Sequence, residues 1–351
     1  MAEKPRVSIV IPAYNEAPCL GKLHQELTTV CEQLPYHFEF VFVNDGSTDQ
    51  TDDVLAELRS RDDRVRYLVL SRNFGHQGAL SAGMSFATGD AVIMMDADLQ
   101  HPPDMIPRLL DCWESGYEVV NTVRIDTEDS TLRKRLFSRA FYWVFKALSG
   151  VPIEPGSADF RLMSREPVDA LNGLPERHRF IRGLVPWLGF RQTSVRFRAP
   201  ARWAGRPKYT FRRSLRLALE GVTAFSLYPL RLVAVFGLVV MVVSFTHGLF
   251  ALVWQLLGGH TVKGWTSLMI CVNFFGGCQL ATIGILSEYL GRTLDQVKGR
   301  PLFILRAARG FSHSSSHENG AIPAPHFSGA TAREARELSR MGHHDVDSAG
   351  Q

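Results

Sequence analysis

Short, almost continuous runs of hydrophobic residues alternate along the first half of the chain with longer stretches in which hydrophobic residues recur every three or four positions. The short runs are typical of strands buried on both faces, and the spaced pattern is typical of helices with one buried face. Strands that alternate with helices predict an α/β domain with a mostly parallel sheet. The expected strands are Val7–Ile11, Phe38–Val43, Val65–Leu70, Ala91–Met95 and Val119–Val123. The expected helices are Leu20–Leu34, Thr51–Ser60, Gln77–Ala87 and Asp104–Glu114.

Four further elements are expected beyond the fifth strand. Residues Leu132–Leu148 form a helix pattern with a basic start and an aromatic face, which is expected to pack on the core. Strands are expected at Asp159–Met163 and Thr193–Phe197. Residues Thr210–Leu227 alternate apolar positions with arginines, which predicts an amphipathic helix in the membrane interface.

Two later stretches have the length of membrane-spanning helices and contain no Asp, Glu, Lys or Arg. They are Leu232–Trp254, with 23 residues, and Trp265–Leu286, with 22 residues. At about 1.5 Å per residue, each is long enough for a hydrocarbon core of about 30 Å. The two tryptophans that face the intervening loop are typical of a membrane interface. The alternative is a pair of helices buried in a soluble core.

Positive charge is concentrated on the outer flanks of these two stretches, although the net charge of the whole chain is only +4. The loop between the stretches carries one basic residue besides histidine, Lys263. Because basic residues favour the cytosolic side, both ends of the hairpin are expected in the cytosol, with the α/β domain on the cytosolic face of the inner (plasma) membrane. Residues 1–6 lead into the first strand without a secretory signal, which favours the same side for the N-terminus. The flanking basic residues are Arg196, Arg198, Arg202, Arg206, Lys208, Arg212, Arg213 and Arg216 before the hairpin, and Arg292, Lys298, Arg300, Arg306 and Arg309 after it.

The cysteines and the C-terminal tail add little chemistry. The five cysteines form no CxxC pair and no zinc spacing, which is typical of reduced thiols. Beyond residue 309 the chain is rich in Ser, His, Gly and Ala, so we expect a disordered tail. Its histidines fit a solvated tail better than a metal site.

An acidic sequence follows the fourth expected strand directly. Asp96, Asp98 and Gln100 stand where a buried strand leaves the core. Ligands of open α/β sheets collect beyond the carboxyl ends of the strands, and Mg²⁺ or Mn²⁺ prefers oxygen ligands. The pattern therefore predicts a metal site for a nucleoside diphosphate. An acidic pair of this kind also occurs in solvated turns.

Polar turns follow the first two strands as well. Residues 12–16 have the sequence Pro-Ala-Tyr-Asn-Glu, and residues 44–49 have the sequence Asn-Asp-Gly-Ser-Thr-Asp. Because parallel strands end at the same edge of a sheet, we expect the three turns to converge into one site.

These motifs resemble glycosyltransferase family 2, and in particular its polyprenyl-phosphate glycosyltransferase branch, which includes dolichol-phosphate mannose synthases and bacterial glucosyl and aminoarabinosyl relatives. The resemblance covers roughly residues 6–305. It implies a GT-A (Rossmann-like) catalytic domain at 1–209, an interfacial helix at 210–228, two transmembrane helices at 229–290, a juxtamembrane segment at 291–309 and a tail at 310–351. The motifs that carry it are Pro12–Glu16, Val43–Asp49, Ser71–Gly75, Asp96–Pro103 and Asp159–Leu162.

The resemblance also implies roles for single residues at the donor. Pro12 and Tyr14 contact the base, Glu16 the ribose hydroxyls, and Asp45 accepts an N–H from the base edge. Asp96, Asp98 and Gln100 hold Mg²⁺ or Mn²⁺, which stabilises the leaving nucleoside diphosphate.

For the acceptor, the resemblance implies that arginines bind a lipid phosphate. The residues are Arg133, Arg139, Arg198 and Arg202, although a solvated basic helix face is the alternative for part of the set. Gly-Arg-Pro-Lys-Tyr at residues 205–209 departs from the usual Gly-Glu-Ser-Lys-Tyr, which makes this loop the least secure correspondence. Asp159 stands where the family has its candidate base; alternatively it only orients Arg161 or caps a turn.

The activity implied is an inverting, metal-dependent transfer of a monosaccharide, UDP-glucose being preferred as donor, to undecaprenyl phosphate at the cytosolic membrane face. GDP-mannose, UDP-N-acetylglucosamine and a modified arabinose donor remain open. A processive polysaccharide synthase would carry Gln-X-X-Arg-Trp, but Ala199 replaces the glutamine before Arg202 and Trp203. A non-catalytic nucleotide-binding module would not need the full set of acidic and basic residues. No nucleic-acid partner is expected, and Gly276 and Gly277 leave a homo-oligomer open.

Overall fold

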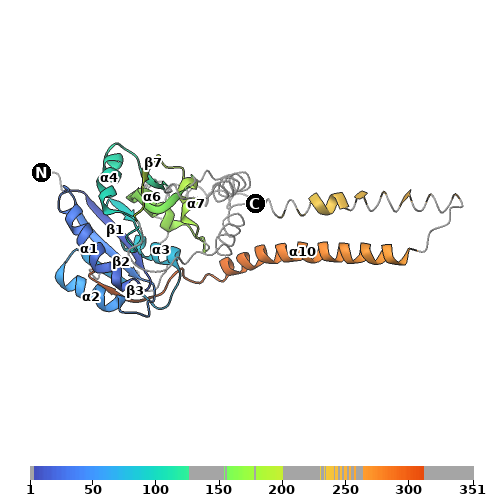
Figure 1. Cartoon of the computed structure of the whole chain (residues 1–351), viewed down its shortest axis with the longest axis horizontal. Coiled ribbons are helices and arrows are strands. Elements are labelled where there is room, and N and C mark those ends of the chain that lie inside the picture. The colour runs from blue at the N-terminus through green and yellow to red at the C-terminus, as the bar shows by residue number, and fades with distance from the viewer. Residues whose placement is uncertain are drawn as a thin grey trace, which may run out of the picture.

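An eight-stranded sheet forms the centre of the domain (Figure 1), in the order β7-β5-β6-β4-β1-β2-β3-β8. The computed structural model describes residues 4–125, 154, 156–177, 179–200, scattered positions between 230 and 257, and 264–311. The seven strands predicted from the sequence are all present. The strands are β1 (Arg6–Ala13), β2 (His37–Asn44), β3 (Val65–Leu70), β4 (Ala91–Met94), β5 (Val119–Arg124), β6 (Ser157–Ser164), β7 (Gln192–Phe197) and β8 (Leu305–Arg309).

Strand direction divides the sheet. Strands β4, β1, β2 and β3 run parallel to one another, and so do β5 and β7. Strand β6 is antiparallel to both β4 and β5, so it enters the carboxyl edge of β4 from the opposite direction. Its first residues, and with them Asp159, therefore lie at the edge where the loops after β1, β2 and β4 emerge.

Helices cover both faces of this sheet. One face carries α1 (Ala17–Cys31), α2 (Thr51–Arg61) and α4 (Ile106–Glu114), which follows the short 3₁₀ turn η1 (Pro103–Met105). The other face carries α3 (His76–Phe86), α6 (Arg165–Gly173) and α7 (Ile181–Trp187). The predicted helix positions for α1 to α4 are confirmed within a few residues. The helix α1 shows why: its buried residues recur every three to four positions, at Cys19, Leu20, Leu23, Leu27 and Cys31.

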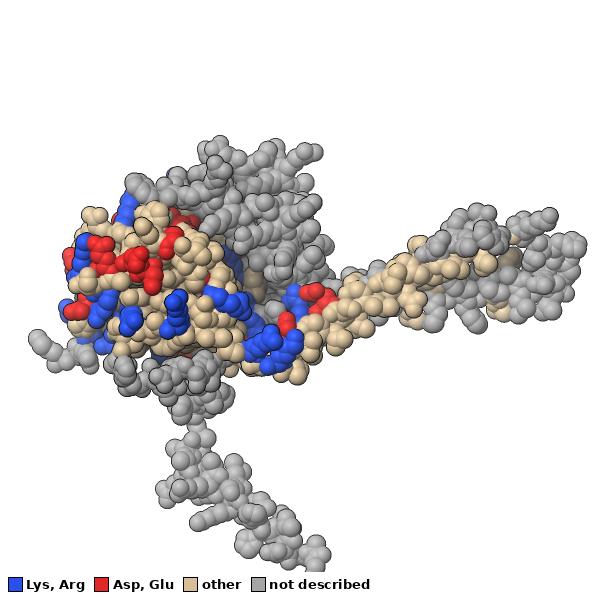
Figure 2. Space-filling model, turned by 90° about the horizontal axis from the view of Figure 1, so that it is seen from below, with Lys and Arg blue, Asp and Glu red and all other residues tan. Residues whose placement is uncertain are grey.

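The long helix α10 (Trp265–Val297) extends away from the domain (Figure 1). Charged side chains gather at the end of this helix nearest the domain, and residues 265–287 include no Asp, Glu, Lys or Arg (Figure 2). Among the helices of the described residues, none combines the length and the hydropathy needed to cross a membrane. Beyond α10 the chain returns to the domain and adds β8 to the free edge of β3. The segment expected to be juxtamembrane thus holds the end of α10 and a strand of the central sheet.

Several sequence predictions concern residues outside the described part of the chain. These are the helix at 132–148, the interfacial helix at 210–227, much of the first apolar stretch and the tail beyond 311. The five cysteines are free thiols, as expected.

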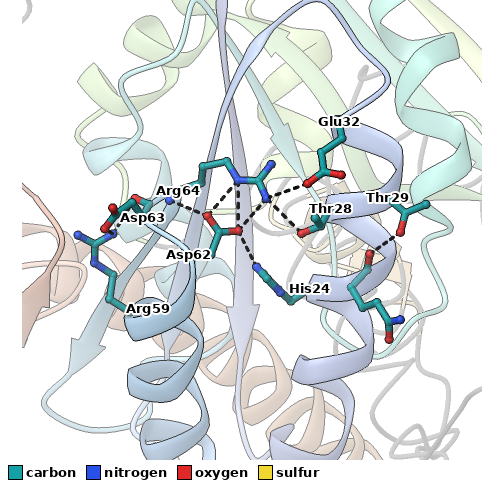
Figure 3. A network of polar contacts seen from close by, with 9 residues as sticks. His24, Thr28, Thr29, Glu32, Arg59, Asp62, Asp63 and Arg64 are labelled. Carbon is teal, nitrogen blue, oxygen red and sulfur yellow. Dashed lines mark hydrogen bonds and ion pairs between the residues drawn. The ribbon is translucent and has the colours of Figure 1, made fainter.

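A polar network joins α1 to the turn between α2 and β3 (Figure 3). Arg64 donates from Nε and Nη2 to the Asp62 carboxylate, at 3.0 and 2.9 Å. His24 Nε2 lies 2.9 Å from the same carboxylate, and Arg64 Nη2 lies 3.4 Å from the Thr28 hydroxyl. Burial would raise the pKa of Asp62, but the hydrogen bonds from Arg64 and His24 outweigh it and lower the pKa to about 2.

This network predicts a pH-dependent contribution to stability. The folded-state pKa of Asp62 lies below its usual value of 3.8, so its stabilisation is complete above about pH 5 and is lost as the pH falls toward 2. We expect Asp62→Asn to lower the melting temperature at pH 6 to 7, with the difference from the wild type shrinking as the pH falls below 4. Thermal unfolding followed at pH 3, 5 and 7 measures it. Asp63→Asn is the control, because the Asp63 side chain is fully exposed. A difference between wild type and Asp62→Asn that grows at acid pH would contradict the assignment.

Candidate active site

The loops after β1 and β2 meet at the carboxyl edge of the sheet, as predicted. The Asn15 N–H donates to the Ser47 hydroxyl at 3.0 Å, and the Thr48 N–H donates to the Asn15 side-chain oxygen at 2.8 Å. Asn15 adopts a left-handed conformation with φ of 56°, which asparagine tolerates better than most residues. The loops hold Tyr14 with 39% of its surface exposed, beside the half-buried Glu16, while Pro12 is buried at the end of β1.

Asp45 is held by a third loop, which follows β3. Its two carboxylate oxygens accept the N–H groups of Phe74 and Gly75, at 2.7 and 3.0 Å. Burial raises the pKa of Asp45 above its ordinary value, and these two bonds partly offset the rise. Gly46 makes the approach possible, because a Cβ at this position would lie 2.5 Å from the Arg72 carbonyl carbon. Each oxygen of Asp45 keeps a second lone pair for a ligand.

The acidic residues follow β4 in a tight turn. Asp98 accepts the Gln100 N–H at 3.1 Å, and Leu99 between them has φ of 61°. The Asp96 N–H donates to His101 Nδ1 at 2.9 Å, so Nε2 of this ring carries the proton. That nitrogen lies 3.6 Å from Asp96 Oδ2, and the ring stacks on Phe160 at a centroid distance of 5.1 Å. His101 therefore holds the backbone of Asp96, and its Nε2 lies near the Asp96 carboxylate.

This donor set fits a divalent cation that also binds a ligand's phosphates. Asp96, Asp98 and Gln100 supply only oxygen ligands and are all partly accessible. In the described residues, no group of three or more His, Cys, Asp or Glu side chains forms a metal site by itself. Mg²⁺ usually takes one or two carboxylates and completes its shell with water and phosphate. The two carboxylates and one amide suit that kind of site better than a closed structural one.

Asp159 lies at the start of β6 beneath these loops and is surrounded by cations. Arg182 of α7 grips its carboxylate with Nε at 2.8 Å and Nη2 at 2.9 Å. His76, the first residue of α3, places Nε2 at 3.3 Å from Asp159 and at 3.5 Å from Asp96. Arg161, with 1% of its surface exposed, lies 3.8 Å away. The sequence left open that Asp159 only orients Arg161. In the structure Arg182 lies closer to the Asp159 carboxylate than Arg161 does.

The protonation states follow from these contacts. Burial would raise the pKa of Asp159, but Arg182 and His76 outweigh it and hold the pKa well below its usual range. Burial alone would lower the pKa of His76, whereas its hydrogen bond to Asp159 and the charge of Asp96 raise it to about 9. At neutral pH the cluster is thus an ionised carboxylate among three cations.

The sequence did not identify Arg182 or the roles of His76 and His101. Arg182 and His76 lie 23 and 83 residues from Asp159, and no local motif marks such pairs. His101 lies within the motif 96–103, but the motif does not show that its ring holds the Asp96 backbone. Of the expected acceptor arginines, Arg198 is described and is exposed after β7. The others, Arg133, Arg139 and Arg202, lie outside the described residues.

Comparisons with known proteins identify the family of the chain. Residues 8–171 match the glycosyl transferase family 2 model. A bactoprenol glucosyl transferase of Shigella phage SfII is 39% identical over 301 residues, which are 86% of this chain and 97% of that protein. The uncharacterized glycosyltransferase YkcC of Bacillus subtilis is 38% identical over 313 residues, 89% of this chain and 97% of its own. Among solved structures, glucosyl-3-phosphoglycerate synthase from Mycobacterium tuberculosis with Mn²⁺ and UDP is 18% identical, with 62% of this chain and 76% of that chain covered and a TM-score of 0.45.

Proposed function

The chain belongs to glycosyltransferase family 2, and from this premise we propose that it transfers glucose from UDP-glucose to undecaprenyl phosphate at a membrane surface. The observation that carries the proposal is the 39% identity to a bactoprenol glucosyl transferase over 97% of that protein's length. The α/β, GT-A-like domain and the clustered donor residues support it.

In this proposal the donor lies across the loops after β1, β2 and β4. Tyr14 and Pro12 contact the base, Asp45 accepts an N–H from its edge, and Glu16 binds the ribose hydroxyls. Asp96, Asp98 and Gln100 hold a divalent cation, which stabilises the negative charge that develops on the departing diphosphate.

The acceptor phosphate attacks the anomeric carbon on the face opposite the leaving UDP. A bond forms between a phosphate oxygen and the anomeric carbon, and the bond from that carbon to the diphosphate breaks, so the configuration inverts. The attacking oxygen is largely ionised near neutral pH, so no strong base is needed. Asp159, whose pKa is held low by Arg182 and His76, suits the role of an ionised anchor for those cations better than that of a proton acceptor. Arg133, Arg139, Arg198 and Arg202 are the proposed ligands of the acceptor phosphate.

A transfer assay with the purified full chain tests the proposal. Labelled UDP-glucose and undecaprenyl phosphate are expected to give one lipid-extractable monosaccharide product that depends on added Mg²⁺ or Mn²⁺. Parallel reactions with GDP-mannose, UDP-N-acetylglucosamine and an aminoarabinose donor test donor choice. A polymer would favour a processive synthase, and no product with any donor would favour a non-catalytic module.

We propose further that residues 232–254 and 265–286 form a membrane hairpin with the domain on the cytosolic side. The support is the absence of Asp, Glu, Lys and Arg from both stretches and the exposure of apolar side chains on α10, including Leu268, Val272, Leu280 and Ile283. Because β8 pairs with β3, the chain beyond α10 is on the same side as the domain.

This topology gives an expected result for two reporters. A reporter inserted at Gly259 is expected on the non-cytosolic side, because the loop around it carries one lysine and the flanks carry many basic residues. A reporter fused after Gln351 is expected in the cytosol. Activity of a phosphatase and fluorescence of a green fluorescent protein at each site measure the two locations. Both reporters on one side would contradict the hairpin.

A further inference from the structure

The segment after α10 reaches the loop that holds Asp45. Residues 300–311, here called the C-terminal strap, contain β8, which pairs with β3 from Tyr67↔Arg309 to Leu70↔Leu305. The pairing continues past the end of β3, where the Ser71 N–H donates to the Ile304 carbonyl at 2.9 Å. The strap therefore lies beside the start of the loop 71–75.

Phe303 anchors the strap at this point. It has 8% of its surface exposed and packs in one hydrophobic cluster with the end of β3 and the first half of α3. Phe74 of the loop packs against the same cluster. Leu302 also approaches the first turn of α3, because a Cβ added to Gly78 would lie 3.5 Å from the Leu302 carbonyl oxygen. The cluster consists of Val43, Leu68, Leu70, Ala79, Ala82 and Phe303.

The loop that Phe303 supports carries the two amides that hold Asp45. Phe74 packs with its side chain on the cluster and donates its backbone N–H to Asp45, and the neighbouring Gly75 donates to the other oxygen. Gly75 adopts φ of 86° and is the residue before α3, so the next residue, His76, starts that helix beside Asp96 and Asp159. An unbroken series of contacts thus runs from Phe303 to Asp45.

The chain is also held to the domain just before the strap begins. Gln296, in the last turn of α10, donates from its side-chain nitrogen to the Pro175 carbonyl at 2.7 Å and accepts the Arg177 N–H at 3.0 Å. The end of α10 is therefore attached to the domain before the strap begins. The loop 71–75 is thus flanked on one side by a segment whose start is fixed at the end of α10.

We propose that the C-terminal strap is part of the donor site, with Phe303 as a positioning residue that holds the loop 71–75 so that Asp45 faces the nucleobase. Phe303 touches no substrate in this scheme and acts through Phe74, Gly75 and Asp45. The proposal rests on the donor role given to Asp45 in the proposed function and extends it to residues far along the chain.

The matched control is Phe311, a second phenylalanine of the same strap. It packs edge-on against Phe86 at the opposite end of α3, at a centroid distance of 5.2 Å. Phe311 also borders the cluster that contains Phe303, but it does so beside Phe86, at the end of α3 away from the loop 71–75. Phe311→Ala therefore removes the same kind of side chain from the same segment at the far end of the cluster. Phe303 is more deeply buried than Phe311, so the test is where exchange changes and not only by how much. A purely structural role for the strap would speed exchange across the domain and not specifically in the loop 71–75.

Hydrogen exchange of the full chain in detergent measures how firmly the Phe74 and Gly75 amides are held. Phe303→Ala is expected to speed exchange of the Phe74 and Gly75 amides by about tenfold or more, while Phe311→Ala changes them less than about twofold. Phe303→Leu keeps an apolar side chain and is expected to fall between the wild type and Phe303→Ala. It carries the test if Phe303→Ala does not fold. Unchanged exchange at both amides in Phe303→Leu and Phe303→Ala, or equal acceleration in Phe311→Ala, would overturn the proposal.

Donor kinetics give the second measurement. Phe303→Ala is expected to raise the KM for UDP-glucose by about fivefold or more and to leave the KM for undecaprenyl phosphate within about twofold. The exchange measurement needs no donor. One outcome is a wild type that transfers no glucose, while Phe303→Ala still speeds exchange of the Phe74 and Gly75 amides and Phe311→Ala does not. That result would refute the proposed function and leave the positioning role standing. A normal KM for UDP-glucose in an active Phe303→Ala enzyme would refute the positioning role alone.

Discussion

Asp98→Ala is expected to lower the rate of glucosyl transfer by about a hundredfold or more while the protein stays folded. The carboxylate lies in the turn after β4 and is partly accessible, so its removal creates no buried cavity. In the proposed function, its loss takes away one of the two carboxylates that would hold the cation. A metal ion that stabilises a leaving diphosphate is worth several kcal/mol, and each 1.4 kcal/mol is about tenfold in rate. Turnover at saturating donor and acceptor measures the effect.

Asp104→Ala is the matched control for this experiment. Asp104 is an exposed carboxylate six residues further along the same loop, in η1, and it lies outside the donor set. Its removal is expected to leave turnover within about twofold, as surface substitutions usually do. Calorimetry of Mn²⁺ with the protein and UDP should show weaker metal binding for Asp98→Ala and not for Asp104→Ala. Wild-type turnover of Asp98→Ala in the presence of a chelator would remove Asp98 from the metal site.

The part of the site that the sequence predicts is the part built from strand ends. The strands β1, β2 and β4 appear as almost continuous apolar runs, interrupted only by Ser8 in β1 and Glu39 in β2. The polar residues that follow each run are adjacent to it in the sequence. Once the strands are parallel, geometry alone places those residues at one edge. This is why Tyr14, Asp45 and Asp96 could be assigned to one site without any knowledge of their contacts.

The direction of β6 and the presence of the edge strand β8 could not be predicted in the same way. The pattern of β6 identifies a strand, but alternation and hydrophobicity are the same for either direction, so its antiparallel pairing with β4 and β5 could not be predicted. The strand β8 has the sequence Leu-Arg-Ala-Ala-Arg and lacks an apolar run. It pairs because the free edge of β3 offers unpaired backbone groups, and that edge exists only in the folded domain.

Contacts between side chains that lie far apart in the sequence could not be predicted either. Arg182 lies 23 residues after Asp159, and His76 lies 83 residues before it. Nothing in the local sequence of α7 distinguishes an arginine that grips a buried carboxylate from one in solvent. Such a pair is set by how α7 and α3 pack on the sheet, which is a property of the tertiary structure.

Asp159→Asn is expected to destabilise the protein by about 3 kcal/mol and to abolish most of its activity in the same step. The substitution keeps the shape of the side chain and removes its charge from a buried position beside Arg161, Arg182 and His76. Arg161 suffers most, because its Nε and Nη1 have no hydrogen-bond partner within the described residues and Asp159 is the anion beside it. A buried cation without its counter-charge costs several kcal/mol, whereas a lost surface pair costs little. Chemical denaturation measures the free energy of unfolding.

A double variant separates an anchoring carboxylate from a catalytic base. Adding Arg182→Gln to Asp159→Asn is expected to recover part of the lost stability, because the second change removes a cation that the first left uncompensated. Asp169→Asn, which breaks an exposed pair with Arg165, is expected to cost less than about 1 kcal/mol and serves as the control. Since Arg182 and His76 hold the pKa of Asp159 well below its usual range, the carboxylate stays ionised across neutral pH, and its stabilisation is lost only as the pH falls through that low value. The rate of the wild type should accordingly show no loss between pH 6 and 8 from protonation of Asp159. An Asp159→Asn protein with the wild type's stability and no activity would instead identify Asp159 as a group that acts on the substrate directly.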